Sequence, residues 1–342
     1  MYRVSIEDDE VDQVQQVVRE VVKRFPSVED EDFQRSAPQY AQELPRSLRA
    51  GLNTFRLTEP DAVCVVTGYP VEEAGLPPTP AHWRQRTERG TAEHAVYFFL
   101  LGCLLGDPVA WATQQDGRVM HDVLPIEGDE HEQTGSSSAV PLTWHTEDAF
   151  HPLRTDYVGL LCLRNPESVA TTFASVREVV LDPGTARVLR EKRFLIRPDH
   201  THLPRNRGES AVHPPEVERL RDLSYEWIVR TDEQPEPVEV LFGDARQPYI
   251  RLDPVFMDRA AHDAEAWQAL EALGEAIEAA LTDHRLAQGE VIFVDNYLAV
   301  HGRKPFTARF DGTDRWLKRL NIVRDLRKSR ASRLTADARA IF

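Results

Sequence analysis

Two closely spaced residues of the chain could hold a metal ion. His145 and Glu147 follow Trp144, where an apolar run that predicts a strand comes to its end. In extended backbone, residues two apart point to the same face, so this imidazole and this carboxylate could reach one ion. The pattern is weak by itself, because a chain with 12 histidines and 56 acidic residues contains roughly two His-x-acid pairs by chance. A half-buried, hydrogen-bonded pair at a strand end would have the same sequence.

A second segment adds a distant histidine and an arginine. Residues 289–302 read as a turn, an apolar strand, an Asp-Asn turn and a second short strand that ends in His301, and Arg315 follows fourteen residues later. Two histidines and one carboxylate on one face of an iron ion leave three positions open, enough for a bidentate 2-oxo acid and oxygen. An arginine nearby could bind the distal carboxylate of that acid through a bidentate ion pair. The combination therefore predicts an iron site that also binds a 2-oxo acid and oxygen.

The elements that must position these residues change in type near residue 111. Apolar spacing predicts helices before that point and in two later insertions, at 11–25, 36–52, 91–102, 176–193 and 260–281. Short apolar runs between turn residues predict strands at 62–66, 119–124, 142–145, 157–163, 238–242, 249–252 and 291–294. Many short strands at such intervals are typical of a sandwich, barrel or jelly roll. Gly135–Ser138 is expected to be a polar loop, either a mobile connector or a lid.

Composition narrows the classes of partner. The chain has 41 basic and 56 acidic residues, a formal charge of −15, which repels phosphate backbones and anionic membranes, so neither nucleic acid nor membrane is an expected partner. A small cationic or zwitterionic substrate fits better. The chain shows no signal-peptide pattern and no apolar run of membrane-spanning length, so a cytoplasmic location is expected. The three cysteines are far apart, which makes disulfides and a thiolate zinc site improbable, and the oligomeric state is open.

The chemistry-bearing residues and their surroundings resemble a known family, the clavaminate-synthase-like iron(II)/2-oxoglutarate oxygenases. Within it they are most similar to the arginine and enduracididine β-hydroxylases of peptide-antibiotic biosynthesis, of the viomycin arginine hydroxylase type. The likeness runs from about residue 40 to about residue 330. The segments that carry it are 111–117 (WATQQDG), 144–150 (WHTEDAF), 156–159 (DYVG), 164–166 (RNP), 301–303 (HGR) and 310–319 (FDGTDRWLKR).

This resemblance implies a fold, a set of cofactors and a reaction. The fold would be mainly β with flanking helices around a distorted double-stranded β-helix, a cupin-like jelly roll. We expect one oxygenase domain over 1–342, with a mainly helical part at 1–110 and the jelly-roll core with helical insertions at 111–330. The cofactors would be Fe(II), 2-oxoglutarate and O2.

The resemblance also assigns the cofactor-binding residues. His145, Glu147 and His301 would be the catalytic iron ligands, while Arg315, helped by Thr171, would bind 2-oxoglutarate. The 2-oxo acid would be decarboxylated to succinate while an unactivated C–H bond is hydroxylated. Retention of Glu147 favours hydroxylation over halogenation, because related halogenases replace this carboxylate.

The resemblance assigns substrate-binding residues as well. Arg319 would bind the carboxylate of an amino acid, and Gln114 together with the free oxygen of Glu147 would lie near its α-amine. Asp199 and Asp253 would lie near the terminus of its side chain. Without the resemblance, a loop aspartate is most simply a turn residue.

Two positions leave the substrate and the site of hydroxylation open. The viomycin enzyme holds a guanidinium with an Asp-x-Asp pair, whereas this chain has Val255 in place of the second carboxylate. A guanidinium held by one carboxylate loses a charge-assisted bond, so citrulline or a cyclised arginine competes with plain arginine. Gln133 falls where related enzymes carry lid residues that aim C3 or C4 at the iron, so the regiochemistry is open.

The sequence therefore predicts hydroxylation at C3 or C4 of a free arginine-type L-amino acid, such as arginine, citrulline or enduracididine, for nonribosomal peptide antibiotic biosynthesis. An alternative keeps the chemistry but uses lysine, asparagine or a carrier-tethered amino acid, although a tethered acid would leave Arg319 without a carboxylate to bind. A non-enzymatic alternative is a metal-binding jelly-roll sensor, which the presence of Arg315 disfavours. The remaining histidines, among them His94, His121 and His284, are expected to be surface or core residues.

Overall fold

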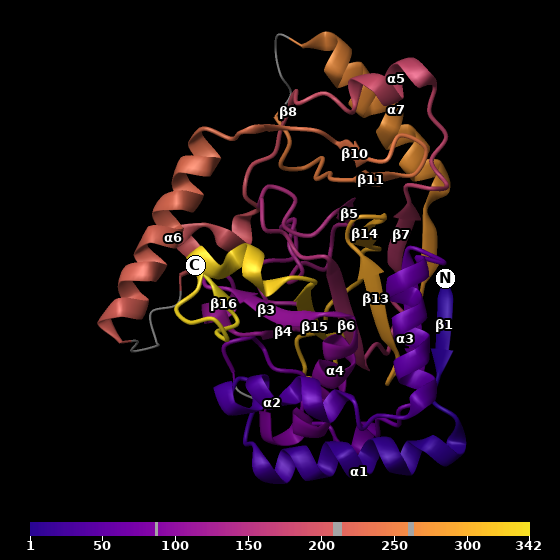
Figure 1. Cartoon of the computed structure of the whole chain (residues 1–342), viewed down its shortest axis with the longest axis vertical. Coiled ribbons are helices and arrows are strands. Elements are labelled where there is room, and N and C mark those ends of the chain that lie inside the picture. The colour runs from indigo at the N-terminus through magenta and orange to yellow at the C-terminus, as the bar shows by residue number, and fades with distance from the viewer. Residues whose placement is uncertain (86–87, 208–213, 259–262) are drawn as a thin grey trace.

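A computed structural model describes residues 1–85, 88–207, 214–258 and 263–342 of the chain (Figure 1). An eight-stranded major sheet runs through the centre, and its N-terminal and C-terminal strands lie at opposite edges. Seven of its strands follow the order β1 (Tyr2–Ser5), β2 (Val63–Thr67), β13 (Val291–Asp295), β6 (Tyr157–Arg164), β15 (Trp316–Val323), β3 (Asp107–Trp111) and β16 (Ala340–Ile341). The eighth strand, β4 (Met120–Val123), pairs with β15.

A four-stranded minor sheet carries two of the predicted iron ligands. Its order is β12 (Thr282–His284), β7 (Thr171–Ser175), β14 (Ala299–Arg303) and β5 (Leu142–His145), with each neighbouring pair antiparallel. The strand predicted at 142–145 is β5, and the one predicted to end in His301 is β14, which runs two residues further.

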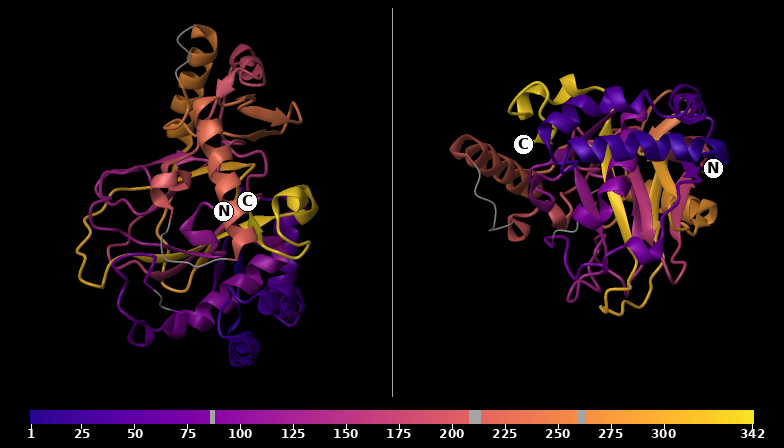
Figure 2. Two further views of the ribbon diagram at one scale, coloured as in Figure 1. Left: turned by 90° about the vertical axis from the view of Figure 1, so that its left-hand side faces the viewer. Right: turned by 90° about the horizontal axis from the view of Figure 1, so that it is seen from below.

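Both faces of the major sheet are buried, which explains why its strands are apolar at consecutive positions. On β13, Val291 and Phe293 point toward the N-terminal helices, while Ile292 and Val294 belong to the core on the side of the minor sheet. The helical side is covered by α1 (Asp8–Arg24), α2 (Glu31–Ala41), α3 (Arg46–Thr58) and α4 (Glu88–Leu105). Helix α4 contacts β3, β6 and β15, and the other three helices pack around it (Figure 2).

The remaining elements lie on the other side of the molecule or at its edge. The helix α7 (Ala264–Ala280) contacts β7 and α5 (Pro183–Val188), and two small two-stranded sheets lie nearby (Figure 1). One pairs β8 (Phe194–Leu195) with β9 (Pro237–Val238), and the other is a hairpin of β10 (Leu241–Gly243) and β11 (Pro248–Ile250). The long helix α6 (Pro215–Glu233) lies along the edge that carries the C-terminus. Short 3-10 turns, which have no labels in the figure, complete the chain.

Two of the predicted helices are wrong. The helix predicted at 36–52 is two helices, α2 and α3, because Pro45 has no N–H to continue a helix and disfavours helical geometry in the residue before it. The helix predicted at 176–193 is reduced to α5, which begins only where Asp182 caps the main-chain N–H groups of Gly184 and Thr185. The strand predicted at 238–242 is split between β9 and β10. The first residues of the helix predicted at 260–281 lie outside the described residues.

The sequence analysis also missed α6 and the strands β1, β3, β7, β8, β12, β15 and β16. On β15 the apolar alternation is interrupted by Lys318 and Arg319, which are both largely buried. Lys318 is on the helical face and forms an ion pair with Asp122 at 2.6 Å, while Arg319 points between the sheets. A strand that faces a polar cavity therefore does not show the pattern of an ordinary core strand.

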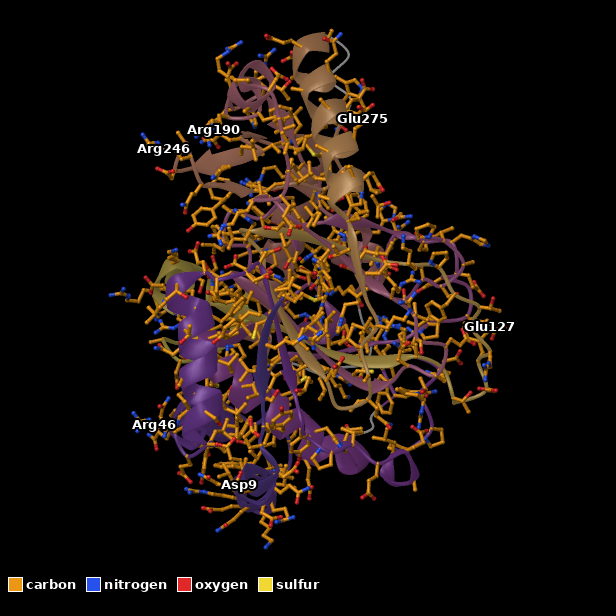
Figure 3. All side chains as sticks on the ribbon, turned by 90° about the vertical axis from the view of Figure 1, so that its right-hand side faces the viewer. Asp9, Arg46, Glu127, Arg190, Arg246 and Glu275 are labelled. Atoms are coloured by element: carbon orange, nitrogen blue, oxygen red, sulfur yellow. The ribbon has the colours of Figure 1, made fainter. Side chains whose placement is uncertain are left out.

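Charged side chains lie at the surface of the molecule. Labelled charged side chains such as Asp9, Arg46 and Glu275 point outward from the ribbon (Figure 3). No helix among the described residues is both long and apolar enough to cross a membrane.

The close packing of α4 on the major sheet gives a test of stability. A Cβ added at Gly159 of β6 would lie 2.9 Å from ring carbons of both Phe98 and Phe293, which are fully buried. We expect Gly159→Ala to lower the free energy of unfolding by about 2 kcal/mol, because overpacked cores are strained. Gly75→Ala is the matched control, since a Cβ there meets no atom within 4 Å. Chemical denaturation of both variants measures the effect, and equal stability of the two would contradict the packing argument.

Candidate active site

The three predicted iron ligands come together at the edge where β5 and β14 pair. His301 lies directly opposite His145 in the antiparallel register, and their ring centroids are 4.7 Å apart. Glu147 follows β5 by two residues, and its Oε2 is 3.4 Å from Nε2 of His301. One ligand atom from each of the three residues lies within 4.8 Å of the others. This spacing suits a single ion held by two nitrogens and one oxygen.

Hydrogen bonds fix the orientation of these groups. The Nδ1 of His145 is 2.8 Å from the main-chain oxygen of Thr143, which sets Nδ1 as the protonated nitrogen and leaves Nε2 for a metal. The Glu147 N–H donates to Oδ1 of Asn296 at 2.7 Å. The amide of Asn296 in turn donates to the main-chain oxygens of Glu147 and Thr155. Asn296 thus fixes the turn that follows β5.

The electrostatics of the three residues fit a bound cation. Burial by itself would raise the pKa of Glu147, but the charge of Arg319 and the neighbouring His301 and His145 lower it well below its usual range. Burial lowers the pKa of His301, which favours the neutral imidazole that a metal requires. The Nδ1 of His301 is buried and has no hydrogen-bond partner in the described part of the chain. A carboxylate and two neutral imidazoles are the donor set that non-haem iron(II) binds.

Arg315 and Thr171 contact each other in the wall of the cavity that also contains the three predicted ligands. Arg315 immediately precedes β15, is 5% exposed, and donates from Nη2 to Oγ1 of Thr171 at 3.3 Å. Thr171 is the first residue of β7, so the contact joins the two sheets. Burial lowers the pKa of Arg315 to about 10, yet it remains a cation at neutral pH. A buried cation that is hydrogen-bonded to a hydroxyl is suited to a carboxylate.

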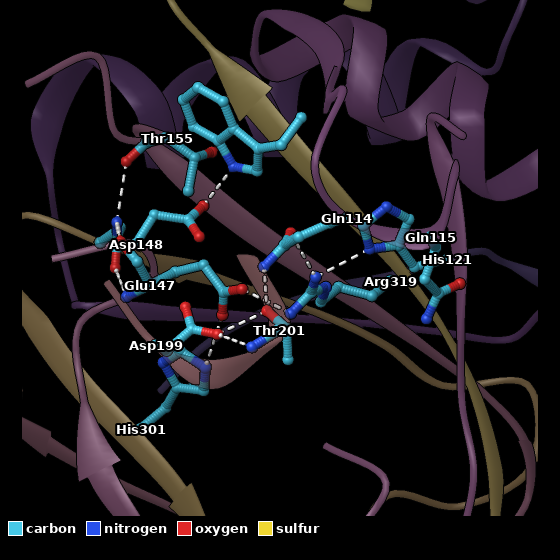
Figure 4. A network of polar contacts seen from close by, with 12 residues as sticks. Gln114, Gln115, His121, Glu147, Asp148, Thr155, Asp199, Thr201, His301 and Arg319 are labelled. Carbon is cyan, nitrogen blue, oxygen red and sulfur yellow. Dashed lines mark hydrogen bonds and ion pairs between the residues drawn. The ribbon is translucent and has the colours of Figure 1, made fainter. Parts of the chain in front are cut away.

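Arg319 lies in a polar network that includes Glu147, with His301 close by (Figure 4). Its Nη1 donates to Oε1 of Glu147, and its Nη2 donates to Oε1 of Gln114 at 3.1 Å and to Nδ1 of His121 at 2.7 Å. His121 is directly opposite Arg319 in the pairing of β4 with β15. Burial and the charge of Arg319 lower the pKa of His121 well below its usual value, which keeps Nδ1 an acceptor.

The same network reaches the predicted end of the substrate. Gln114 donates to Oγ1 of Thr201 at 2.8 Å, and Thr201 donates to Asp199. Asp253 is buried nearby, and burial is the main cause that raises its pKa to about 7, with a smaller contribution from the charge of Asp199. A cation or a hydrogen-bonding neutral group could therefore bind at this end.

One cavity is lined by every residue that the sequence analysis assigned to iron, 2-oxoglutarate or substrate. Those residues are Gln114, Gln133, His145, Glu147, Thr171, Asp199, Asp253, Val255, His301, Arg315 and Arg319. The side chain of Gln133 accepts from Thr143 N–H and donates to the oxygen of Pro141, so it is bonded to the segment that leads into β5. Val255 is 43% exposed at the cavity.

The chain is similar to known proteins in both sequence and fold. The family described as taurine catabolism dioxygenase TauD, TfdA family matches residues 86–321. The chain is a TauD/TfdA-family dioxygenase.

Curated relatives cover its whole length. The dioxygenase is 48% identical over 343 residues to the enduracididine beta-hydroxylase of Streptomyces hygroscopicus, with 100% of each chain covered. It is 45% identical over 344 residues to the L-ornithine/L-arginine 3-hydroxylase of Catenulispora acidiphila, again with 100% of each covered. The crystal structure of the non-heme iron oxygenase OrfP with Fe, succinate and (3S)-hydroxy-L-Arg has a TM-score of 0.91 at 36% identity, with 100% of each chain covered.

Several residues of the dioxygenase site were not found from the sequence. His121 was expected to be a surface or core residue, and it is buried, but it also contacts Arg319. Asp148 and His202 form a buried pair, 2.9 Å apart, that links the segment after β5 to the turn that begins at Asp199. Asp148 lies inside the 144–150 segment and could have been singled out, whereas nothing in the sequence relates it to a histidine more than fifty residues away.

The donor set predicts a measurable affinity for a divalent ion. We expect the purified dioxygenase to bind one equivalent of Fe(II) or Co(II) without oxygen, and His301→Ala to weaken that binding by about 100-fold or more because one of three ligands is lost. Isothermal titration calorimetry measures both. His284→Ala is the control, because His284 pairs with Glu290 and is not part of the cavity. Equal affinity of the His301 variant and the wild type would contradict the site.

Proposed function

We propose that the dioxygenase uses Fe(II), 2-oxoglutarate and O2 to hydroxylate C3 or C4 of a free arginine-type L-amino acid. One observation carries the proposal: a single cavity holds the His145, Glu147 and His301 set together with two positively charged groups, Arg315 and Arg319. A metal site in such a cavity can bind a 2-oxo acid through one arginine and the carboxylate of an amino acid through the other.

The relatives support this substrate class. Two of them have names that specify hydroxylation at the β or 3 position of enduracididine, ornithine or arginine. OrfP has been solved with Fe and alpha-ketoglutaric acid, with L-Arg, and with hydroxylated arginine. Both curated names favour C3 for this dioxygenase. Peptide-antibiotic biosynthesis is the pathway class that the resemblance in the sequence implies.

The residues of the chain prepare the site for this chemistry. With iron, 2-oxoglutarate and oxygen bound, the site would supply hydroxylation of a C–H bond together with decarboxylation of the 2-oxo acid to succinate. His145, Glu147 and His301 would hold the metal, and the bond from His145 to Thr143 O fixes the imidazole orientation. Arg315 would bind the distal carboxylate of 2-oxoglutarate, with Thr171 holding the guanidinium in place.

The amino-acid side of the cavity would be organised by Arg319. In the structure its guanidinium is bonded to Glu147, Gln114 and His121. A substrate carboxylate would add a bidentate partner for this cation. The α-amine would then lie near Gln114 and Glu147, and the side-chain terminus near Asp199 and Asp253. Fixing both ends of the amino acid places one carbon near the metal.

We also infer that the two sheets form a distorted double-stranded β-helix and that residues 1–342 are one domain. Consecutive strands alternate between the sheets, with β5 and β7 in the minor sheet and β6 between them in the major sheet. The run of β13, β14 and β15 repeats this alternation. The N-terminal strands β1 to β3 and the C-terminal β16 all belong to the major sheet, which favours one cooperative unit.

The proposed reaction has a direct test. Purified dioxygenase is mixed with Fe(II), 2-oxoglutarate, oxygen and separate free amino acids: arginine, citrulline, enduracididine, ornithine, lysine and asparagine. We expect mass spectrometry to find a gain of one oxygen atom on an arginine-type member and an equal amount of succinate. His301→Ala should give neither product. A gain confined to lysine or asparagine would refute the substrate class, and no gain with any of them would refute the reaction.

Val255 gives a sharper test of the substrate terminus. We expect Val255→Asp to raise kcat/KM for arginine relative to citrulline by about tenfold, because a second carboxylate adds a charge-assisted bond to a guanidinium but not to a urea. Val255→Asn is the matched control, since it adds a polar group of similar size without charge. Competition assays with both amino acids measure the ratio. A ratio that Val255→Asp leaves unchanged would show that position 255 does not contact the terminus.

A further inference from the structure

Arg303 lies in the wall of the cavity, and the proposed reaction gives it no role. It follows His301 by two residues on β14, so the two side chains point to the same face of the minor sheet. Arg303 is 4% exposed and lines the cavity together with Arg315. The register places Arg303 opposite Thr171, whose hydroxyl accepts from Arg315. Both arginines are therefore neighbours of the same threonine.

The hydrogen-bond acceptors of Arg303 are all neutral in the part of the chain that the structure describes. Its Nη2 donates to Oγ of Ser137 at 2.8 Å and to the main-chain oxygen of Val140 at 3.3 Å. Its Nη1 donates to the main-chain oxygens of Lys304 at 3.1 Å and Ser138 at 3.4 Å. Arg315 likewise bonds to a hydroxyl, and the described residues place no carboxylate in an ion pair with either group.

Two buried cations with neutral partners are an unusual arrangement. Arg303 is 4% exposed and Arg315 is 5% exposed, so both guanidinium groups are buried. Their Nε atoms have no hydrogen-bond partner among the described residues. Buried charges are costly unless an opposite charge compensates them. A ligand with a carboxylate would compensate both at once.

Arg303 also anchors a segment of the cavity wall. Ser137 and Ser138 are 1% and 2% exposed, so this part of the predicted polar loop is buried. The guanidinium carbon of Arg303 is 5.0 Å from the ring centre of Phe306, whose N–H donates to the oxygen of Ser138 at 2.8 Å. Gly135 of the same loop lines the cavity. The loop is therefore hydrogen-bonded to a charged group that lines the cavity.

We propose that Arg303 is a positioning residue for the distal carboxylate of 2-oxoglutarate, whose charge it helps Arg315 to balance while its hydrogen bonds hold the 137–140 segment in the cavity wall. This inference rests on the proposed function, since it concerns the same 2-oxo acid. It predicts that binding of 2-oxoglutarate makes the 137–140 segment of the cavity wall more ordered. A bound dicarboxylate fixes Arg303, and Arg303 then fixes the 137–140 segment.

The effect of the Arg303 charge is tested by measuring how tightly 2-oxo acids bind to iron(II)-loaded protein without oxygen. We expect Arg303→Gln to raise the Kd for 2-oxoglutarate about tenfold, because one of two positive charges is removed. The Kd for 2-oxopentanoate, which has the same chain length but no distal carboxylate, should change less than about twofold. Arg303→Lys, which keeps the charge, should bind 2-oxoglutarate within about threefold of wild type. Calorimetry measures each Kd.

The role of Arg303 in holding the cavity wall is tested by hydrogen exchange of the main-chain amides of residues 134–140 in the same samples. We expect 2-oxoglutarate to slow exchange there in the wild type. In Arg303→Lys the exchange should be faster with and without the ligand, because an ammonium cannot make the same set of bonds. A merely structural role would weaken the binding of both 2-oxo acids equally and would give no ligand-dependent protection.

A matched control separates this effect from a general loss of charge. Lys304→Gln removes a neighbouring positive charge whose side chain is 52% exposed, and should change neither Kd nor exchange. Equal affinity of wild type and Arg303→Gln for 2-oxoglutarate would overturn the inference alone, as would a Lys variant that binds as weakly as the Gln variant. Wild-type protein that does not bind 2-oxoglutarate would overturn the proposed function and this inference together.

Discussion

The antiparallel pairing of β5 with β14 is the constraint on which the rest of the site depends. It places His301 directly opposite His145, and the strands can approach this closely only because residue 302 is glycine. A Cβ at Gly302 would lie 2.5 Å from the main-chain oxygen of Leu142 and 3.1 Å from the Trp144 nitrogen. The register is irregular between His301 and Arg303. A shift of one residue would turn the histidine to the opposite face and remove the ligand.

Burial of charge explains how the cavity is organised around that pair. Glu147 remains ionised in a buried position because Arg319 and two imidazoles lie beside it. Arg315 and Arg303, in contrast, have neutral partners among the described residues. In the proposed function, a dicarboxylate would supply negative charge beside these two arginines.

The helices contribute by covering the outer face of the major sheet. Helix α4 and the helices around it bury the outward-pointing residues of β6, β13 and β15, which leaves the inner face free to line the cavity. This is why strands such as β15 carry both fully buried apolar residues and Arg319. The rigid outer layer also fixes the position of Arg315, which immediately precedes β15. Precise placement of such groups is what orientation of a substrate requires.

The chemistry of this protein was predictable from the sequence, because the residue types at 145, 147, 301 and 315 suit an iron site with a 2-oxo acid and the longer motifs around them resemble those of iron(II)/2-oxoglutarate oxygenases. Many of the element positions were also predictable, since apolar periodicity is a local property. The helix at 176–193 and the missed strand β15 show the limit: local pattern fails where proline and capping residues shorten a helix, or where a strand faces a polar cavity. Only the tertiary structure brought His121 to Arg319, Asp148 to His202 and Arg303 to the loop at 137–140. These contacts join distant segments through strand register and burial, and no local spacing encodes them.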